Sequence, residues 1–188
     1  MRGEVSVVTE RAREVLKPLT KAEAERAVRA ALDRVGGELD SRVRGYELLF
    51  EKPPRRGGVP LRRVRVLVGE ATRDIAYDVI VDSKGKVVTA DRREGENFPL
   101  LRDEIARAEG IAARDERVAR VLERSGVRAG AFEPPAQEDL HRLVGLHYMT
   151  TSDPAAIEPV ATVVVDLAGE EVASFTLDEG AVARLSGG

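Results

Sequence analysis

The chain contains two histidines, His141 and His147, and Tyr148 directly follows the second one. Histidine titrates near neutral pH, so this pair could transfer protons or bind a small molecule. Their separation of six residues is even, so on one extended strand both imidazoles would point to the same face. No carboxylate stands directly beside either histidine in the sequence. A structural explanation is simpler: the histidines are two half-exposed strand residues, or one of them caps a helix. We favour this explanation and keep His141, His147 and Tyr148 as catalytic candidates.

Metal and thiol chemistry have little support in the sequence. The spacing of the two histidines fits no common pair of metal ligands on one strand or one helix turn. The chain has no cysteine, which excludes disulfides, thiolate metal sites and a cysteine nucleophile and leaves the cellular compartment open. We therefore expect no metal site and no cofactor.

A pair of carboxylates, Asp78 and Asp82, lies in a segment that alternates between apolar and polar residues. On a strand both would share one face with Ile80, and two carboxylates on the concave side of a sheet could act as general acid and base. The solvated face of a half-buried strand explains Asp78 as well. Turn formation explains Asp82 better than catalysis, because Asp166 stands at the same place in a second copy of the turn. Asp78 remains a candidate, and we favour the structural explanation for both.

The most basic stretch of the chain combines the loop over residues 52–56 with Arg62, Arg63 and Arg65. Such a patch could bind a phosphate, a nucleic acid or an acidic partner. No aromatic residue is interleaved for base stacking, and the formal net charge of the chain is -3. We therefore favour a solvated loop, expect no nucleic acid, and keep the three arginines as candidates for ligand binding. The sequence has no glycine loop of phosphate-binding spacing and no serine-centred nucleophile motif.

The composition is that of a globular domain. Hydrophobic residues make up 43% of the 188 residues and charged residues 34%, whereas aromatic residues make up only 4%. The core is therefore expected to consist of valine, leucine, isoleucine and alanine. The longest apolar stretches fall far short of the ~20 residues of a membrane span, and the first residues do not resemble a secretion signal. We expect no membrane association and a cytoplasmic protein.

Residues 76–91, AYDVIVDSKGKVVTAD, predict a β-hairpin that organises the chain. Apolar and polar residues alternate on either side of a turn that contains glycine, the residue that best tolerates a positive φ. A related phrase, VVVDLAG, begins at residue 163, and a β-branched strand follows it with one extra residue after the glycine. Each copy follows a helical segment and further strands, so we predict two related modules in tandem.

The first predicted module spans residues 18–96, after a lead-in over residues 1–17 with a helix over residues 10–16. Thr20 and Glu23 have the spacing of a capping box, so a helix is expected to begin there and to end at Gly36-Gly37. Strands are predicted over residues 42–52 and 62–68 and in the hairpin over residues 75–92. The second module spans residues 97–188, with helices over residues 100–108 and 115–124 and strands over residues 140–150, 160–166 and 171–176. The predicted class is α+β, with each module a helix packed on an antiparallel sheet of about four strands.

Several segments together resemble the second and third domains of copper amine oxidases, the two small domains that precede the catalytic one. The matching segments are Pro18-Leu19-Thr20 with Glu23, Glu51-Lys52-Pro53, Tyr77-Asp78-Val79-Ile80-Val81-Asp82, Leu100-Leu101-Arg102-Asp103-Glu104, Asp115-Glu116-Arg117-Val118 closing on Arg124-Ser125-Gly126-Val127, Ile157-Glu158-Pro159, Val163-Val164-Val165-Asp166 and Glu171-Val172. The resemblance rests on their order and spacing over roughly residues 15 to 178. It implies a cystatin-like fold for each module.

The resemblance does not imply the family's chemistry. The catalytic tyrosine of the family, which becomes a topaquinone, and its three copper-binding histidines lie in a carboxy-terminal domain that we expect to be absent here. With two histidines, one protomer cannot assemble a site of three.

The sequence therefore favours a stand-alone, non-catalytic module that binds a partner protein or a small molecule and self-associates as a homodimer. An accessory subunit of a separate catalytic chain is one form of this hypothesis. The alternative is a small enzyme that uses a pocket on the curved sheet, with His147 and either Tyr148 or Asp78 transferring protons. A third and more remote reading is a copper- and quinone-dependent oxidase.

Overall fold

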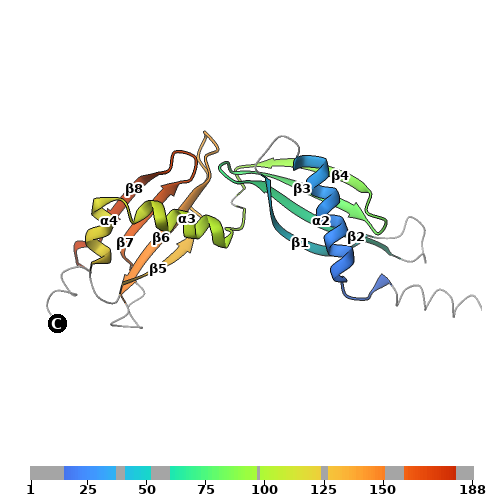
Figure 1. Ribbon diagram of the computed structural model, residues 1–188, viewed down its shortest axis with the longest axis horizontal. Coiled ribbons are helices and arrows are strands. Elements are labelled where there is room, and N and C mark those ends of the chain that lie inside the picture. The colour runs from blue at the N-terminus through green and yellow to red at the C-terminus, as the bar shows by residue number, and fades with distance from the viewer. Residues whose placement is uncertain are drawn as a thin grey trace, which may run out of the picture. The chain divides into compact units, whose positions relative to one another are not determined.

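The computed structural model describes residues 15–36, 41–51, 60–96, 98–123, 127–150 and 159–180 (Figure 1). The predicted helix over residues 10–16 lies mostly outside these residues, and the basic loop over residues 52–56 lies wholly outside them. The chain divides into two compact units. Unit 1 comprises Met1–Glu70 and Ala76–Arg93, and unit 2 comprises Ala71–Ile75 and Glu94–Gly188. Each unit contains a four-stranded antiparallel sheet whose strand order follows the chain, so the predicted α+β class with two tandem modules is confirmed.

Unit 1 consists of one helix followed by four strands. They are α2 Lys21–Val35, β1 Ser41–Glu51, β2 Leu61–Glu70, β3 Ile75–Asp82 and β4 Val87–Glu94. The predicted capping box is present, because Thr20 Oγ1 accepts a hydrogen bond from the Glu23 amide at 3.3 Å and Glu23 Oε2 accepts one from the Thr20 amide at 2.9 Å. Two backbone donors that the helix leaves unpaired are satisfied in this way.

The core of unit 1 lies between α2 and the sheet (Figure 1). Small residues on the helix, Ala27 and Ala31, allow it to approach the sheet closely, and the strands present branched side chains to it. The buried strand residues are Val64, Val66 and Val68 on β2 and Val79 and Val81 on β3. The predicted inward face of β2 is confirmed, and Asp78 and Asp82 fall on the opposite face of β3.

Unit 2 has two helices and a second four-stranded sheet. Its elements are α3 Arg102–Ala112, α4 Glu116–Leu122, β5 Val127–Phe132, β6 Leu143–Thr150, β7 Pro159–Asp166 and β8 Glu171–Leu177. We did not predict β5, since its sequence VRAGAF is rich in residues with weak strand preference. Pairing with β6 makes it a strand, with Gly130 opposite His147 and Phe132 opposite Gly145.

The strand predicted over residues 140–150 begins later than expected. Leu140 has a positive φ of 57°, and His141 forms only an isolated β-bridge with Arg73 before β6 starts at Leu143. The prediction that one continuous strand carries both histidines is therefore wrong.

Helices α3 and α4 cover one face of the unit 2 sheet (Figure 1). The buried cluster joins Ala108, Ile111, Ala112, Val118 and Val121 of the helices to Val144, Leu146, Tyr148, Ala161, Val163 and Val165 of the sheet. The even-numbered residues of β6 therefore face the helices, and the odd-numbered residues, including His147, face away. Within the residues that the structure describes, no helix is both long enough and apolar enough to cross a membrane.

Both copies of the predicted hairpin turn are present, and an aspartate at the equivalent position caps each one. Asp82 Oδ1 accepts hydrogen bonds from the amides of Lys84 and Lys86, both at 2.9 Å. Asp166 Oδ1 accepts them from the amides of Ala168 at 2.7 Å and Gly169 at 3.1 Å. The left-handed residue is Gly85 in the first turn, with φ 85°, and the extra residue Glu170 in the second, with φ 55°.

Candidate functional sites

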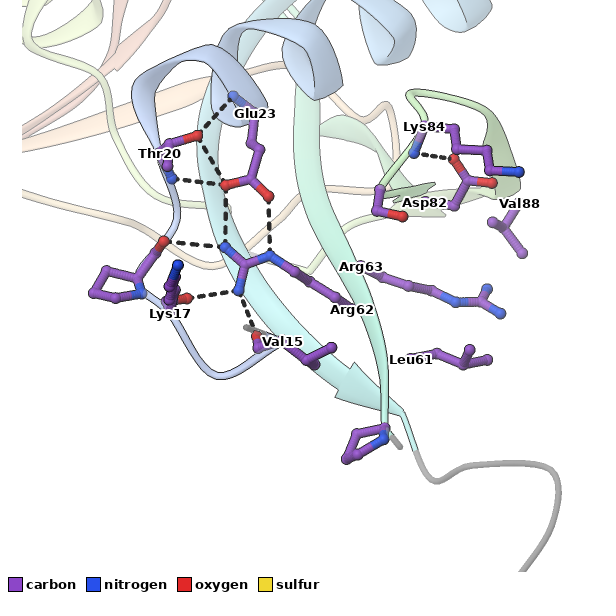
Figure 2. A pocket seen from close by; sticks show the side chains of 13 residues that line it. Val15, Lys17, Thr20, Glu23, Leu61, Arg62, Arg63, Asp82, Lys84 and Val88 are labelled. Carbon is purple, nitrogen blue, oxygen red and sulfur yellow. Dashed lines mark hydrogen bonds and ion pairs between the residues drawn. The ribbon is translucent and has the colours of Figure 1, made fainter. Parts of the chain in front are cut away.

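A hollow of about 640 Å³ opens in unit 1 between the segment before α2, the start of β2 and the β3–β4 turn (Figure 2). We call it the unit 1 groove. The residues that line it are Val15, Lys17, Pro18, Thr20, Glu23, Pro60, Leu61, Arg62, Arg63, Asp82, Ser83, Lys84 and Val88. Leu61 and Val88 are exposed large apolar residues, so the groove combines apolar contact area with four basic and two acidic side chains.

Arg62 forms one wall of the groove, but its donors are used within the protein. Its Nε and Nη2 bind the two carboxylate oxygens of Glu23 at 3.0 and 3.1 Å. The remaining bonds go to the carbonyl oxygens of Val15 and Lys17, both at 2.6 Å, and of Pro18 at 3.0 Å (Figure 2). A guanidinium has five N–H donors, and all five are engaged here. Arg62 therefore ties the segment before α2 to the sheet.

The Arg62 guanidinium also sets the ionisation of Glu23. Its hydrogen bonds, followed by the bond from the Thr20 amide, lower the pKa of Glu23 from 4.5 to about 2. The carboxylate therefore stays charged throughout the physiological range and holds both the helix cap and the arginine.

Arg63 and Arg65 point to the face of the sheet opposite α2, and Figure 2 shows Arg62 and Arg63 leaving β2 in opposite directions. Arg63 lines the groove and forms an ion pair with Glu51 at 3.0 Å. Arg65 lies outside the groove lining and bonds to Glu47 at 3.0 Å and to Asp78.

Asp78, the candidate acid–base residue of unit 1, is the centre of an arginine network. Arg65 binds both of its carboxylate oxygens, through Nε at 2.8 Å and through a shorter Nη2 contact. Arg93 approaches the same carboxylate at 3.3 Å. The hydrogen bonds from Arg65 hold the pKa of Asp78 below its ordinary value. A carboxylate held in this state is a poor proton donor at neutral pH.

His141 pairs with Asp166, a residue 25 positions away in the sequence. Its Nδ1 lies 2.6 Å from Asp166 Oδ2, while Asp166 Oδ1 caps the turn after β7. This contact raises the pKa of His141, and the more distant Asp139 carboxylate adds to the effect. Burial raises the pKa of Asp166, but hydrogen bonds from His141 and the turn amides outweigh it, so that pKa is lowered. The geometry is that of a carboxylate orienting an imidazole, with Nε2 as the nitrogen for any ligand.

His147 has a different environment on the outer face of β6. Its Nδ1 lies 3.0 Å from Thr162 Oγ1, and its ring stacks on Phe132 with centroids 4.2 Å apart and an interplanar angle of 14°. The stack depends on Gly145, because a Cβ there would lie 2.2 Å from the Phe132 ring. Tyr148 points the other way, into the helix-facing core, and is 2% exposed. The structure therefore places the three candidates in separate environments instead of one shared site.

The most buried ionic cluster of the described residues was not among the sequence candidates. Arg142, between the two histidines in sequence, binds Asp74 at 3.2 Å and Glu104 at 3.3 Å, and their side chains are 3%, 5% and 4% exposed. It also donates to the carbonyl oxygens of Phe98 at 2.8 Å and Pro99 at 3.3 Å. One signal in the sequence pointed to this cluster. Side chains on a strand alternate between its two faces, so Arg142 falls on the same inward face as Val144 and Leu146. A charge on that face needs buried partners of opposite charge.

The segment Ala71–Ile75 connects β2 to β3 in the first sheet but belongs to unit 2, and Arg142 explains why. The amide of Arg142 donates to the Thr72 carbonyl at 2.8 Å, and the amide of Asp74 donates to the Leu140 carbonyl at 2.7 Å. Backbone and side chain together fix this loop in the second unit. We assign the Arg142 cluster a structural role.

No protein-family model matches this sequence, and no curated protein matches it. Among solved structures, the chain is similar to a copper-containing benzylamine oxidase from Hansenula polymorpha, with a TM-score of 0.52 and 15% sequence identity. The match covers 86% of this chain and 29% of that oxidase chain. The likeness shows the fold alone. It supports the resemblance to copper amine oxidases inferred from the sequence, without saying which domains correspond.

The side chains of this chain do not fit a copper site like the three-histidine site of copper amine oxidases. Within the described residues, no group of three or more histidine, cysteine, aspartate or glutamate side chains could hold a metal ion. The whole sequence has only two histidines, and Asp166 engages one while Thr162 and Phe132 engage the other. These side chains cannot supply a copper site of three histidines from one protomer.

Proposed function

We propose that this chain is a non-catalytic binding module, and that the unit 1 groove receives an acidic, partly apolar segment of a partner protein. The observation that carries the proposal is the chemistry of the groove. It places the exposed side chains of Leu61 and Val88 beside a lining in which basic residues outnumber acidic ones. Apolar contact provides affinity, and a surface of one charge steers a partner of the opposite charge.

Both acidic residues of the groove lining are engaged within the protein, so neither presents an unused carboxylate to an incoming anion. Glu23 is bound by Arg62, and Asp82 accepts two amides of its own turn. Lys84 is exposed at the rim beside Asp82 (Figure 2). An acidic segment would therefore meet a positively charged lining with no unengaged carboxylate facing it among the described residues.

A non-catalytic role is also supported by the state of the candidate acid–base groups. Asp78 is held by two arginines, and His147 is held by Thr162 and Phe132. Neither histidine lines the unit 1 groove or the hollow of about 660 Å³ beside β7 and β8. We further infer that the two units correspond to the second and third domains of the amine oxidases, as the order of matching segments indicates, and act as an accessory chain.

Selection from a displayed library of random 12-residue peptides tests the groove. We expect the enriched peptides to combine acidic and apolar residues and to lose binding to the double variant Leu61→Asp, Lys84→Glu. The matched control is Lys21→Glu, which changes the same charge at a side chain that is 90% exposed and outside the groove lining. Enrichment that is equal for the groove variant and the control would overturn the proposal.

A second candidate function is acid–base catalysis on a small molecule, and the His141–Asp166 pair is the specific observation that favours it. The side chain of His141 is 40% exposed and its Nδ1 is bound to Asp166, which leaves Nε2 as the nitrogen for a solute. Hydrolysis of p-nitrophenyl acetate, a substrate that imidazoles attack, tests this candidate. A rate that falls to background in His141→Gln would support it, and equal rates in the two proteins would remove His141 from any such mechanism.

A further inference from the structure

Strand β1 is an edge of the unit 1 sheet. The strand order is β1-β2-β3-β4, so no described strand pairs with the outer side of β1. The strand is 11 residues long, longer than β4 at the other edge, which has 8. An open edge presents alternating backbone donors and acceptors to any strand of suitable shape.

The middle of β1, residues 46–50, has the sequence YELLF and is apolar at four of its five positions. Tyr46, Leu48 and Phe50 share the face that α2 covers, because Tyr46 pairs with Val66 and Leu48 with Val64. The helix does not bury this edge, and Tyr46 is 56% and Phe50 45% exposed. Natural edge strands usually carry lysine, proline or inward-pointing charges that prevent pairing, and this stretch has a single charged residue, Glu47.

The charges of β1 that would repel a second strand are paired within the unit. Glu47 binds Arg65 at 3.0 Å, and Glu51 binds Arg63 at 3.0 Å. Both arginines lie on β2, the inner neighbour of β1, so the two carboxylates are held by the sheet behind them. The edge therefore combines open backbone groups, exposed aromatic side chains and neutralised charges.

We propose that β1 pairs antiparallel with β1 of a second copy of this chain, with Leu48 on the two-fold axis. This register places Tyr46 opposite Phe50 of the second copy on the helix-covered face. On the other face it places Glu47 opposite Leu49. Cross-strand aromatic pairs of this kind stabilise a sheet beyond its backbone hydrogen bonds.

The alternative registers are disfavoured by side-chain pairing and geometry. A shift of the pairing by two residues places either Tyr46 or Phe50 opposite Leu48 of the second copy, so the pairs of Tyr46 with Phe50 are lost. A shift by one residue turns the apolar side chains of the two copies to opposite faces. The ladder also has natural ends, because the register of β1 with β2 is interrupted between Val43 and Gly45 and β1 ends at Glu51. With Leu48 on the axis, Gly45 of each copy lies opposite Glu51 of the other, so the paired segments of the two strands end at the same positions.

The dimer uses a surface distinct from the unit 1 groove, because no residue of β1 lines that groove. The inference therefore adds to the proposed binding function and does not depend on it. A ladder of this length is smaller than a standard protein interface of about 1,200–2,000 Å², so we expect a weak dimer whose population rises with concentration.

Site-specific disulfide formation tests the register, and the absence of native cysteine makes every crosslink interpretable. Leu48→Cys is expected to form a disulfide-linked dimer under mild oxidation, because residues opposite each other on antiparallel strands have Cβ atoms about 4.5–5.5 Å apart. Glu47→Cys is expected to crosslink to itself far less, since its equivalent in the second copy is out of register. Thr89→Cys, on the opposite edge strand β4, is the control for random collision.

Light scattering of the cysteine-free protein provides an independent measurement. We expect the average mass to rise toward that of a dimer with concentration, and the double variant Tyr46→Lys, Phe50→Lys to remain a monomer. Equal crosslinking at positions 48 and 89, or a wild-type monomer at millimolar concentration, would overturn the dimer. Either result would leave the peptide-selection test of the groove unaffected, so the two proposals can fail separately.

Discussion

The two units contain the same turn, but they use its aspartate differently. In unit 1, one carboxylate oxygen of Asp82 caps the turn through two amides at 2.9 Å. In unit 2, one oxygen of Asp166 caps the turn in the same way, and the other oxygen binds His141 at 2.6 Å. A turn-capping carboxylate has a second oxygen that is not needed for the turn, and unit 2 uses it to hold a titratable side chain.

Arg65 of unit 1 and Arg142 of unit 2 differ in how far solvent reaches their ion pairs. The ion pairs of Arg65 in unit 1 are partly solvated, since its side chain is 36% exposed. The side chain of Arg142 in unit 2 is 3% exposed and binds two carboxylates that are almost as buried. Water screens the first network, and only the protein can compensate the charges of the second. Unit 2 should therefore depend on Arg142 far more than unit 1 depends on Arg65.

The largest expected effect is that of Arg142→Met. The substitution keeps most of the side-chain volume but leaves Asp74 and Glu104 buried without their cation, which is expected to cost about 3–5 kcal/mol. Hydrogen exchange followed by mass spectrometry measures each unit separately. Amides of α3 and β6 should lose protection by roughly 10²- to 4 × 10³-fold, since each 1.4 kcal/mol corresponds to about a factor of ten.

The matched control is Arg65→Met in unit 1. Its network is partly exposed, so we expect a loss of about 1 kcal/mol or less in the protection of β2 and β3. Equal losses in the two units would show that burial does not distinguish the networks, and the comparison would be wrong.

Local patterns in the sequence predicted the features that depend only on residues close together in the chain, namely strand faces, a helix cap and turns. The alternation of Val64, Val66 and Val68, the capping box of Thr20 and the repeated turn all follow from spacing within one element, and the structure has them. Strand β5 was missed because its alanines and glycine carry little strand preference, and pairing with β6 creates it.

The candidate sites were harder to predict because their partners are distant in the chain. The absence of a carboxylate beside His141 in the sequence counted against it, yet Asp166 lies 2.6 Å from its ring. Arg142 was overlooked between the two histidines, although its inward position in the alternating pattern of β6 was visible. Sequence spacing shows which face a residue occupies, and only the fold shows which distant group meets it there.

A smaller effect is expected from Asp166→Asn compared with Asp82→Asn. Asparagine can retain the acceptor oxygen that caps the turn, but in unit 2 it removes the charge that binds His141. The imidazole of His141 is 40% exposed, so water screens its contact with Asp166, and at pH 6 we expect Asp166→Asn to lower the protection of β7 and β8 by only about two- to fivefold. Asp82→Asn should change the protection of β3 and β4 by less than about twofold. A larger loss at Asp82 would contradict the additional role assigned to Asp166.

The smallest effect is a pH dependence near neutral pH, which only unit 2 should have because both histidines lie in it. Asp166 raises the pKa of His141 above its ordinary value of 6.5, Asp139 adds to the effect, and partial burial and Arg73 oppose it. A histidine whose pKa is raised on folding contributes stability that is fully present below about pH 6.5 and lost as the pH rises through the folded value. NMR titration of the His141 ring should give a midpoint above 6.5 in the wild type that moves down in Asp166→Asn. The hairpin of Asp82 holds no histidine, so protection of β3 and β4 should not follow this transition. A wild-type midpoint at or below 6.5, or one that the substitution leaves unchanged, would mean that the contact with Asp166 does not set the charge of His141.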